Sequence, residues 1–421
     1  MINLEEFSKS LKDNFVIDES QKIALAVSGG ADSMCLTLLA HKAGFNVICL
    51  IIDHGLRSTS NEEATKTKEF LNNNGIEAVI IKWLDYNPTF AMNNLHQKAR
   101  DERYRLLITY CLNNNIKYLA IAHNKNDQAE NVLIRISRGT GIDGLALMKD
   151  LQNRGGIFVI RPLLNYERIE IERTLQHFEW SWIDDPSNFS EKFTRTRIRE
   201  LLKNNSDDLK LDRLVLLAKN ATRAKSYLEE QTLEALTKNT FTKNLGAIGL
   251  NVVDFLLVHE EIQFRIISSI LRQITVKNWS IRLTSLEALL GKIKNFENWH
   301  DCTFHGCELL KIKGKDALLF IREKNCIQEL VIEKGKTDVV WDNRFSITLS
   351  DPSDKNITIK TLEKKHLAIL RNQILIDERN IEHHKLKWIM PIMISDSEII
   401  ACPLLGWAGD KIKFNVRSIM S

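Results

Sequence analysis

The chain has 421 residues and a mass of 48.5 kDa, more than one hydrophobic core usually serves, so two or three domains are expected. Hydrophobic residues make up 44% and charged residues 27%, which excludes the disordered, collagen-like and membrane-embedded classes. The net charge of +4 is too small to indicate nucleic-acid binding by itself.

No apolar stretch approaches the ~18 residues of a membrane-spanning helix, and the amino-terminal stretch is acidic and amphipathic rather than signal-like. Seven scattered cysteines, an odd number, favour reduced core thiols over a disulfide framework. We therefore expect a cytoplasmic protein. Cys302, His305 and Cys307 are spaced unlike a Cys-x-x-Cys metal knuckle, so a structural turn is favoured there over a metal site.

The first 165 residues alternate short apolar runs with helical patterns, which is typical of βαβ units. Near-continuous apolar runs predict strands covered on both faces. The predicted strands are 22–28, 46–53, 77–83, 118–123 and 157–163, and the predicted helices are 32–43, 61–73, 92–114 and 127–137. The pattern predicts a doubly wound, mostly parallel α/β domain that binds ligands at the carboxyl ends of its strands.

The pattern changes after residue 166, where long amphipathic helices dominate to about residue 291. Short alternating segments return after residue 298 and predict a small β-containing domain. We expect an α/β domain at 1–215, a helical domain at 216–297 and a small mixed α/β domain at 298–421. Near the end, lysines and histidines flank Trp388; a solvated surface is favoured there over an RNA contact.

A glycine-rich loop, Ser28-Gly29-Gly30-Ala31-Asp32-Ser33, follows the first predicted strand and opens the first helix. Consecutive glycines let backbone N–H groups approach an anion, and the helix amino terminus adds a favourable dipole. Neither a Walker Gly-Lys-Ser/Thr ending nor a Gly-x-Gly-x-x-Gly pattern is present. The loop therefore predicts a phosphate cradle of another kind.

SGGADS resembles the SGGxDS signature of PP-loop ATP-pyrophosphatases, which cleave ATP between the α- and β-phosphates. The resemblance implies that the loop binds ATP through Ser28, Gly29, Gly30, Ala31, Asp32 and Ser33. Asp32 is then a candidate ligand of Mg²⁺, since hard cations take carboxylate and phosphate oxygens.

Further motifs resemble the tRNA(Ile)-lysidine synthetase family in particular. Asp53-His54-Gly55-Leu56-Arg57 resembles its DHxLR motif, and Arg138-Gly139-Thr140-Gly141 resembles its RGTGxxGL segment. The segments 161–164 (RPLL) and 185–188 (DPSN) also match. Ordered matches over about 200 residues are more specific than a single loop.

The segment from His123 to Asn131 resembles the family's HxxDDQxET motif. Asp127 and Glu130 are three residues apart at a helix start, so both carboxylates share one face and are candidates to bind Mg²⁺ or a substrate ammonium. Asn126 and Asn131 replace the family's Asp and Thr, which puts in question any role that needs a third negative charge.

The segment from residue 192 to residue 225 contains ten Lys and Arg but only four Asp and Glu. Arg195, Arg197 and Arg199 fall where the family carries an RxRxR element, and Arg suits forked contacts with phosphate. Which of the three contacts ATP and which contacts RNA stays open. Arg100, farther upstream, is expected to approach the nucleotide or to pair with acids on its own helix.

The resemblance implies ATP-dependent ligation of free lysine onto the wobble cytidine of the CAU anticodon of tRNA(Ile), through an adenylated base. It also implies that 1–215 is the catalytic domain and that the helical domain at 216–297 contacts the tRNA. Asp32, Asp127, Glu130 and Arg197 are the candidate catalytic residues, with Asp32 and Asp127 as Mg²⁺ ligands. The alternatives are a tRNA thiolase of the same superfamily, disfavoured because no Cys-x-x-Cys is present, and a non-catalytic tRNA-binding factor. The oligomeric state is left open, with a homodimer as one option.

Overall fold

The computed structural model describes residues 1–18, 20–53, 55, 60–83, 95–183, 194–205, 207–243, 246–276, 281–350, 353–373, 384–402, 407–408 and 414–418. The chain divides into two compact units, Met1–Ser226 and Tyr227–Ser421. None of the helices in the described part of the chain is long and apolar enough to cross a membrane.

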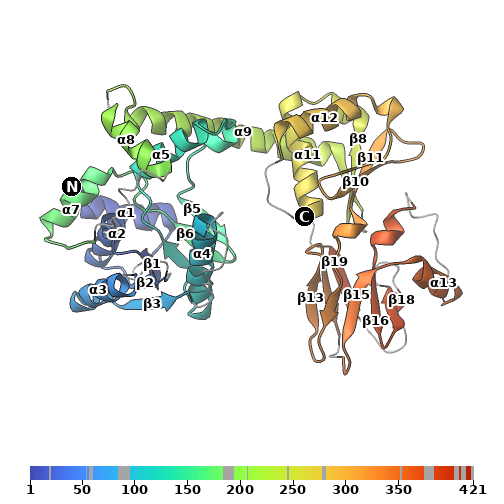
Figure 1. The fold of residues 1–421 in the computed structure, drawn as a ribbon, viewed down its shortest axis with the longest axis horizontal. Coiled ribbons are helices and arrows are strands. Elements are labelled where there is room, and N and C mark those ends of the chain that lie inside the picture. Colours follow the sequence, from blue (N-terminus) through green and yellow to red (C-terminus); the bar gives the residue numbers. More distant parts are fainter. Residues whose placement is uncertain are drawn as a thin grey trace. The chain divides into compact units, whose positions relative to one another are not determined.

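Unit 1 is built on a six-stranded sheet in the order β3-β2-β1-β4-β6-β5 (Figure 1). All neighbours pair in parallel except β5 and β6. The strands are β1 Ile23–Val27, β2 Val47–Asp53, β3 Ala78–Lys82, β4 Tyr118–Ala120, β5 Leu151–Arg154 and β6 Ile157–Ile160. The chain leaves β1 towards β2 and later returns to its other side as β4, so the sheet has a topological switch point between β1 and β4.

Both faces of this sheet are buried, because successive side chains of a strand point to opposite sides. Ile23, Leu25 and Val27 of β1 join a core with helices α1, α2 and α7, whereas Ala24 packs into a second core with α4. The helices of unit 1 are α1 Leu4–Phe15, α2 Ala31–Lys42, α3 Ser60–Asn73, α4 Leu95–Asn113, α5 Lys125–Ile136, α6 Ile142–Leu145, α7 Arg168–His177, α8 Thr194–Asn204 and α9 Leu211–Asn239. The predicted doubly wound α/β domain is confirmed.

Unit 2 begins within α9 and contains three antiparallel sheets. The first has the order β7-β8-β11-β10-β9, the second β12-β15-β16-β17-β18 and the third β13-β14-β19. The strands are β7 Thr240–Lys243, β8 Ala247–Asn251, β9 Cys302–Phe304, β10 Cys307–Lys311, β11 Ala317–Arg322, β12 Leu330–Ile332, β13 Asp338–Trp341, β14 Phe345–Leu349, β15 Ile357–Thr361, β16 Pro391–Ser395, β17 Glu398–Cys402, β18 Trp407–Ala408 and β19 Phe414–Ser418. The helices are α10 Val252–Leu256, α11 Glu260–Thr275, α12 Leu283–Lys294 and α13 Lys364–Gln373, with short 3-10 turns η2 Phe296–Asn298, η3 Lys324–Cys326 and η5 Leu386–Ile389.

The first sheet of unit 2 joins segments on both sides of residue 297. Strand β8 precedes that position and pairs with β11, which follows it. The structure divides the chain into two compact units, and the finer division into domains at 1–215, 216–297 and 298–421 stays a prediction.

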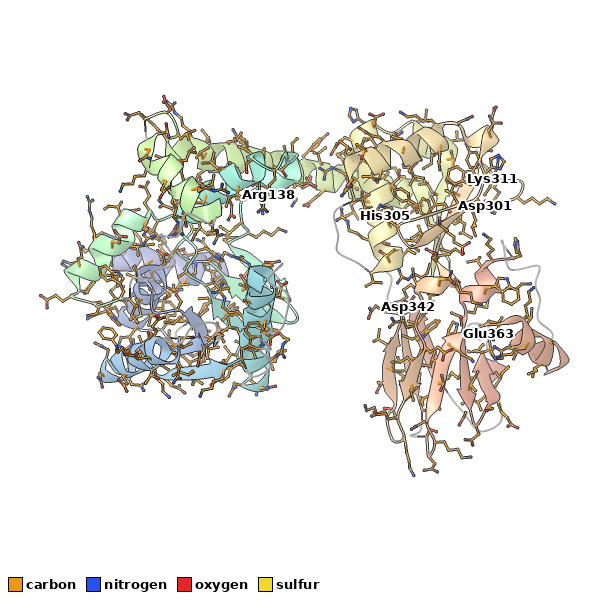
Figure 2. The ribbon with its side chains drawn as sticks, viewed as in Figure 1. Arg138, Asp301, His305, Lys311, Asp342 and Glu363 are labelled. Atoms are coloured by element: carbon orange, nitrogen blue, oxygen red, sulfur yellow. The ribbon has the colours of Figure 1, made fainter. Side chains whose placement is uncertain are left out.

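The turn between β9 and β10 explains the spacing of Cys302, His305 and Cys307. His305 and Gly306 both have positive φ, 49° and 79°, as a two-residue hairpin turn requires. No group of three or more metal-ligating side chains occurs among the described residues. The segment is a tight hairpin, as favoured from the sequence, and His305 marks it in Figure 2.

Candidate active site at the carboxyl end of the parallel sheet

The glycine-rich loop connects β1 to α2 and is held together by its own serines. Ser33 Oγ donates to Gly30 O at 2.9 Å and accepts from Ser28 N at 3.2 Å. Gly30 is the N-cap of α2, and no side chain caps this helix. The first N–H groups of α2 are therefore left for another acceptor, as a phosphate-binding helix terminus requires.

Gly29 is confined by both its backbone and its surroundings. Its φ is +82°, a conformation that residues with a side chain rarely adopt, and a Cβ would lie 2.7 Å from Thr67 Oγ1. Its carbonyl accepts a hydrogen bond from Ile183 N at 2.9 Å. The loop is thus pinned between α3 and the segment after α7.

The switch point brings the first two candidate acids together. Asn124 Nδ2, at the end of β4, donates to Asp32 Oδ1 at 2.8 Å. Asn124 and Asp127 form a reciprocal capping box at the start of α5, with both bonds at 3.0 Å. Burial and then the negative charge of Asp127 raise the pKa of Asp32 above its ordinary value. Two carboxylates therefore repel each other beside the loop, where a cation is favourable.

Glu130 lies one helical turn beyond Asp127 and is almost fully buried. Its Oε1 accepts from Arg199 Nε at 2.7 Å, and its side chain is 4% exposed. Burial raises the pKa of Glu130, against the opposing effect of Arg199. Its Oε2 has no hydrogen-bond partner among the described residues, so one carboxylate oxygen is left for a ligand.

The orientation of α8 distinguishes the three arginines whose roles the sequence left open. Arg195 and Arg199 are four residues apart and share a helix face, whereas Arg197 is exposed on another face. Positive charge from Arg195 acts on Glu130 and on His123. The structure therefore brings Arg195 and Arg199 to the site and does not bring Arg197 there.

A neutral histidine borders the acids. Burial, opposed by the charge of Asp127 and assisted by Arg161, Arg100 and Arg195, lowers the pKa of His123 to about 4. Its Nδ1 has no hydrogen-bond partner in the part of the chain that the structure describes. Acids and guanidinium groups thus lie close together at this edge of the sheet, an arrangement suited to a polyanion with its counterion.

Comparison with known proteins identifies the family. Residues 3–205 match the family described as the PP-loop domain. A protein of Wolbachia pipientis wMel named tRNA(Ile)-lysidine synthase is 33% identical over 414 residues, which cover 95% of this chain and 93% of that protein. This chain belongs to the tRNA(Ile)-lysidine synthase family.

Another protein of that name, from Orientia tsutsugamushi, is 28% identical, and the alignment covers 97% of this chain and 95% of that protein. Both lysidine synthases match across the two units rather than in the PP-loop domain alone. Among solved structures, a U34-tRNA thiolase of Methanococcus maripaludis aligns with 52% of this chain and 78% of the thiolase chain. The TM-score is 0.45 and the sequence identity 19%.

Several residues of the lysidine synthase motifs lie away from the acids or outside the described residues. Asp53 Oδ1 accepts from Ser60 Oγ at 2.6 Å and from Gly55 N at 3.1 Å, so this carboxylate shapes the loop after β2. Arg138 and Gly139 are exposed beyond the far end of α5, a further 14 Å or so along the helix from Asp127 at 1.5 Å per residue (Figure 2). The remaining members, His54, Arg57 and the 185–188 turn, lie outside the described residues.

The sequence did not single out Arg168 as a site residue, and it gave Asn126 only as a departure from the family's motif. Asn126 Oδ1 accepts from Arg168 N at 2.9 Å, which joins the start of α5 to the start of α7. Arg168 binds Glu172 at 2.9 Å, and the negative charges of Asp32 and Glu130 also act on it. The signal for Arg168 was its place four residues after the matching RPLL segment. Asn126, which departs from the family's motif, has a structural role as it stands.

Proposed function

We propose that this chain ligates lysine to the wobble cytidine of the CAU anticodon of tRNA(Ile), using ATP and forming lysidine. The observation that carries the proposal is the match to lysidine synthases over 95% of the chain, with the phosphate loop and the paired acids at one end of the sheet. The product would convert a methionine anticodon into an isoleucine anticodon. Carbon–nitrogen bond formation driven by ATP makes the enzyme a ligase.

The first half-reaction would activate the base. The cytosine O2 attacks the α-phosphorus of ATP, the bond to the bridging oxygen breaks, and pyrophosphate leaves with the electron pair. The free N–H groups at the start of α2 and the backbone of Gly29 and Gly30 would bind the phosphates, where they stabilise developing negative charge.

Mg²⁺ fits the donors at this site, because Asp32 offers half-buried carboxylate oxygens and its pKa is raised by burial and by Asp127. Bound there, the ion would neutralise the departing pyrophosphate. Since no three acidic, His or Cys side chains converge among the described residues, phosphate oxygens would complete its coordination. Asp32 is the main ligand in this proposal and Asp127 the second.

The second half-reaction would transfer lysine. The ε-amino group, after losing a proton, attacks C2 of the adenylated cytosine; the bond between C2 and O2 breaks, and AMP leaves with O2 and the electron pair. Glu130 and Asp127 would hold the lysine ammonium, because Glu130 keeps one carboxylate oxygen without a partner among the described residues. Arg199 orients Glu130 through its 2.7 Å bond.

A thiolase function is disfavoured by the cysteines. In unit 1, Cys35, Cys49 and Cys111 are buried. Burial raises the pKa of Cys49 to about 12 and that of Cys111 to about 11, and it also raises the pKa of Cys35. Thiols that resist ionisation are poor nucleophiles. A non-catalytic tRNA-binding factor is disfavoured because it would have no use for buried, mutually repelling acids beside a phosphate loop.

The substrates proposed are therefore ATP, free lysine and tRNA(Ile), with Mg²⁺ as cofactor. Seven free cysteines fit the reducing cytoplasm, where we propose that the reaction takes place. The exposed cations of α8 and α9 are the proposed contacts to tRNA phosphates.

The test is incorporation of radiolabelled lysine into a tRNA(Ile) transcript with a CAU anticodon, in the presence of ATP and Mg²⁺. A transcript with uridine in place of the wobble cytidine is the matched control and should remain unlabelled. Absence of label from the cytidine transcript, with pyrophosphate release still present, would reject lysine as the nucleophile.

A further inference from the structure

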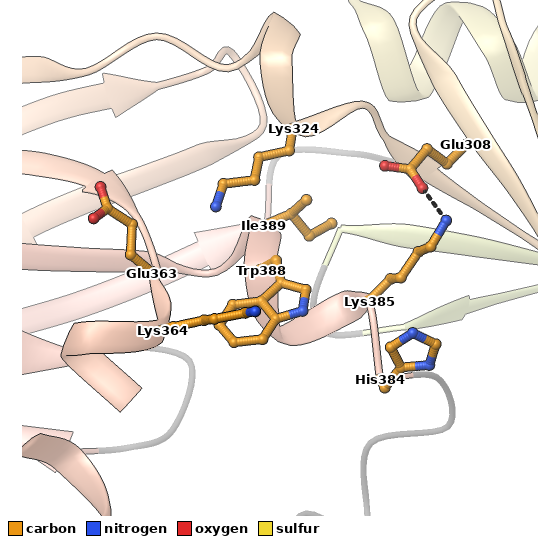
Figure 3. Close-up of a pocket in the computed structure, with 8 residues that line it drawn as sticks. All are labelled: Glu308, Lys324, Glu363, Lys364, His384, Lys385, Trp388 and Ile389. Atoms are coloured by element: carbon orange, nitrogen blue, oxygen red, sulfur yellow. Dashed lines mark hydrogen bonds and ion pairs between the residues drawn. The ribbon is translucent and has the colours of Figure 1, made fainter. Parts of the chain in front are cut away.

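Unit 2 contains a cavity of about 430 Å³ far along the chain from the PP-loop, at the junction of its first two sheets. It is lined by Glu308, Lys324, Glu363, Lys364, His384, Lys385, Trp388 and Ile389 (Figure 3). The volume lies within the range of small-molecule sites, roughly 300–1,000 Å³. We call this cavity the Trp388 pocket.

The indole of Trp388 is held in place by packing on both sides of the turn that carries it. Leu386 and Ile389 of η5 belong to the core beneath β10 and β11, while Trp388 packs against the core of α13 and β16. A half-buried aromatic ring fixed between two cores offers a rigid stacking surface at little entropic cost.

The acids of the Trp388 pocket are already paired with lysines. Glu308 Oε2 binds Lys385 Nζ at 2.7 Å, as Figure 3 shows. Glu363 lies 3.1 Å from Lys365 Nζ and 3.9 Å from Lys360 Nζ. Pairing neutralises both carboxylates, so the remaining lysines set the sign of the pocket.

Cations surround the ring of Trp388. Lys324 Nζ lies 5.9 Å and Lys387 Nζ 5.1 Å from its centroid, within the range of cation–π contacts. Lys364, the first residue of α13, is exposed and lines the same cavity. Burial lowers the pKa of the neighbouring His366, and the negative charge of Glu363 opposes this shift.

We propose that the Trp388 pocket binds a nucleotide, with the base stacked on Trp388 and the phosphate held by Lys324 and Lys364. An aromatic floor with a cationic rim matches a flat base joined to an anion, and aromatic stacking is how unpaired nucleotides are commonly bound. Two sources carry this chemistry: a free mononucleotide and an unpaired nucleotide of an RNA. The inference goes beyond the proposed ligase reaction and is tested by binding alone.

The experiment uses the full chain, uridine 5′-monophosphate and an octauridylate bearing 5-iodouridine. Irradiation should crosslink the oligonucleotide to the peptide that contains Trp388. Excess free UMP that suppresses this crosslink, and itself binds, identifies a mononucleotide site; a crosslink that UMP leaves intact identifies RNA as the source. Absence of the crosslink, together with unchanged affinity in Trp388→Leu and Lys364→Glu, overturns the proposal.

Variants separate stacking, charge and folding. Trp388→Leu should weaken octauridylate binding roughly tenfold, whereas Trp388→Phe, which keeps an aromatic face, should retain most of the affinity. Lys364→Glu should weaken binding and flatten its salt dependence. Lys334→Glu makes the same charge change on an exposed lysine elsewhere in unit 2 and should leave affinity unchanged. Equal losses in Lys334→Glu and Lys364→Glu would show that only net charge matters and would overturn the site.

Discussion

Asp32 combines a functional position with an electrostatic cost to the fold. Its pKa is raised by burial first and by Asp127 second. An acid whose pKa is raised on folding destabilises the native state at every pH above that pKa, and the cost fades as falling pH protonates it. The site therefore maintains a half-buried charge at neutral pH that the fold itself disfavours, as expected where function competes with stability.

Asp32→Asn separates these two effects. We expect pyrophosphate release to fall at least ~100-fold, because the charge that would hold the metal is lost. The variant should nevertheless unfold at a higher temperature than the parent at neutral pH, since its amide can still accept from Asn124. That gain in thermal stability should vanish as the pH falls towards 3.8, the ordinary pKa of an aspartate. Thermal melts across pH measure it, and a variant less stable than its parent at neutral pH would contradict an electrostatic cost at Asp32.

Glu130 distinguishes the two half-reactions. Glu130→Gln removes the charge at nearly constant size, so the lysine concentration needed for transfer should rise ~10-fold or more while tRNA-dependent pyrophosphate release is partly retained. Separate assays of pyrophosphate release and lysine transfer measure this. Glu77→Gln, which disrupts an exposed ion pair with Lys22 at the amino end of the sheet, is the control. Equal loss in both half-reactions, with no change in the lysine requirement, would reassign Glu130 to metal binding or folding.

At the level of elements, the start of α7 depends on a side chain from α5. Asn126→Ala removes the acceptor of Arg168 N and should cost about 1 kcal/mol of stability in unit 1, a typical value for losing a helix cap. Asn126→Asp restores an acceptor and a favourable charge at a helix amino terminus, so it should stay close to the parent. Urea unfolding followed by circular dichroism measures both. Equal destabilisation by Ala and Asp would show that the amide itself, rather than its oxygen, is needed.

The parallel core was predictable because its strands are continuous apolar runs; the predicted 46–53 and 77–83 correspond to β2 and β3. The edge strand β5 was missed, since Leu151–Arg154 is polar and pairs on one side only. The β7–β8 hairpin was also missed within a stretch predicted to be helical. A five-residue apolar run such as Ala247–Asn251 does not distinguish helix from strand by its period.

The candidate site was predictable only as far as local motifs reach. The loop and the pair Asp127 and Glu130 are short-range patterns, and the structure places them together with Asp32. The hydrogen bond between Glu130 and Arg199 spans 69 residues, and no periodicity encodes which arginine of α8 makes it. Only the helix phase, set by where α8 begins, separates Arg199 from Arg197.

For the whole molecule, the excess of positive charge between residues 192 and 225 has a measurable consequence for tRNA binding. The exposed cations of α8 and α9 include Lys203, Arg213 and Lys219. If they follow tRNA phosphates, replacing all three with Gln should reduce the slope of log affinity against log salt by roughly 0.7–0.9 for each phosphate that is no longer neutralised. Filter binding at several salt concentrations measures the slope.

The matched control replaces three exposed lysines elsewhere in unit 1 with Gln, namely Lys9, Lys66 and Lys117. This variant has the same net charge as the first but should keep the parent slope. Identical slopes for the two triple variants would mean that tRNA responds to overall charge, and that the α8 and α9 surface is simply solvated.

The tight surroundings and positive φ of Gly29 limit which substitutions this position can accept. Every missense codon one base away from a glycine codon adds a Cβ, which here would meet Thr67 Oγ1 at 2.7 Å in a backbone of φ +82°. Gly30 differs, since its Cβ would meet only Ser28 Oγ at 3.7 Å, an ordinary contact. In a saturation library selected for growth, we expect Gly29 to accept no missense allele. Purified Gly30→Ala should melt like the parent, so any loss of its pyrophosphate release would report hindered approach of the phosphates alone.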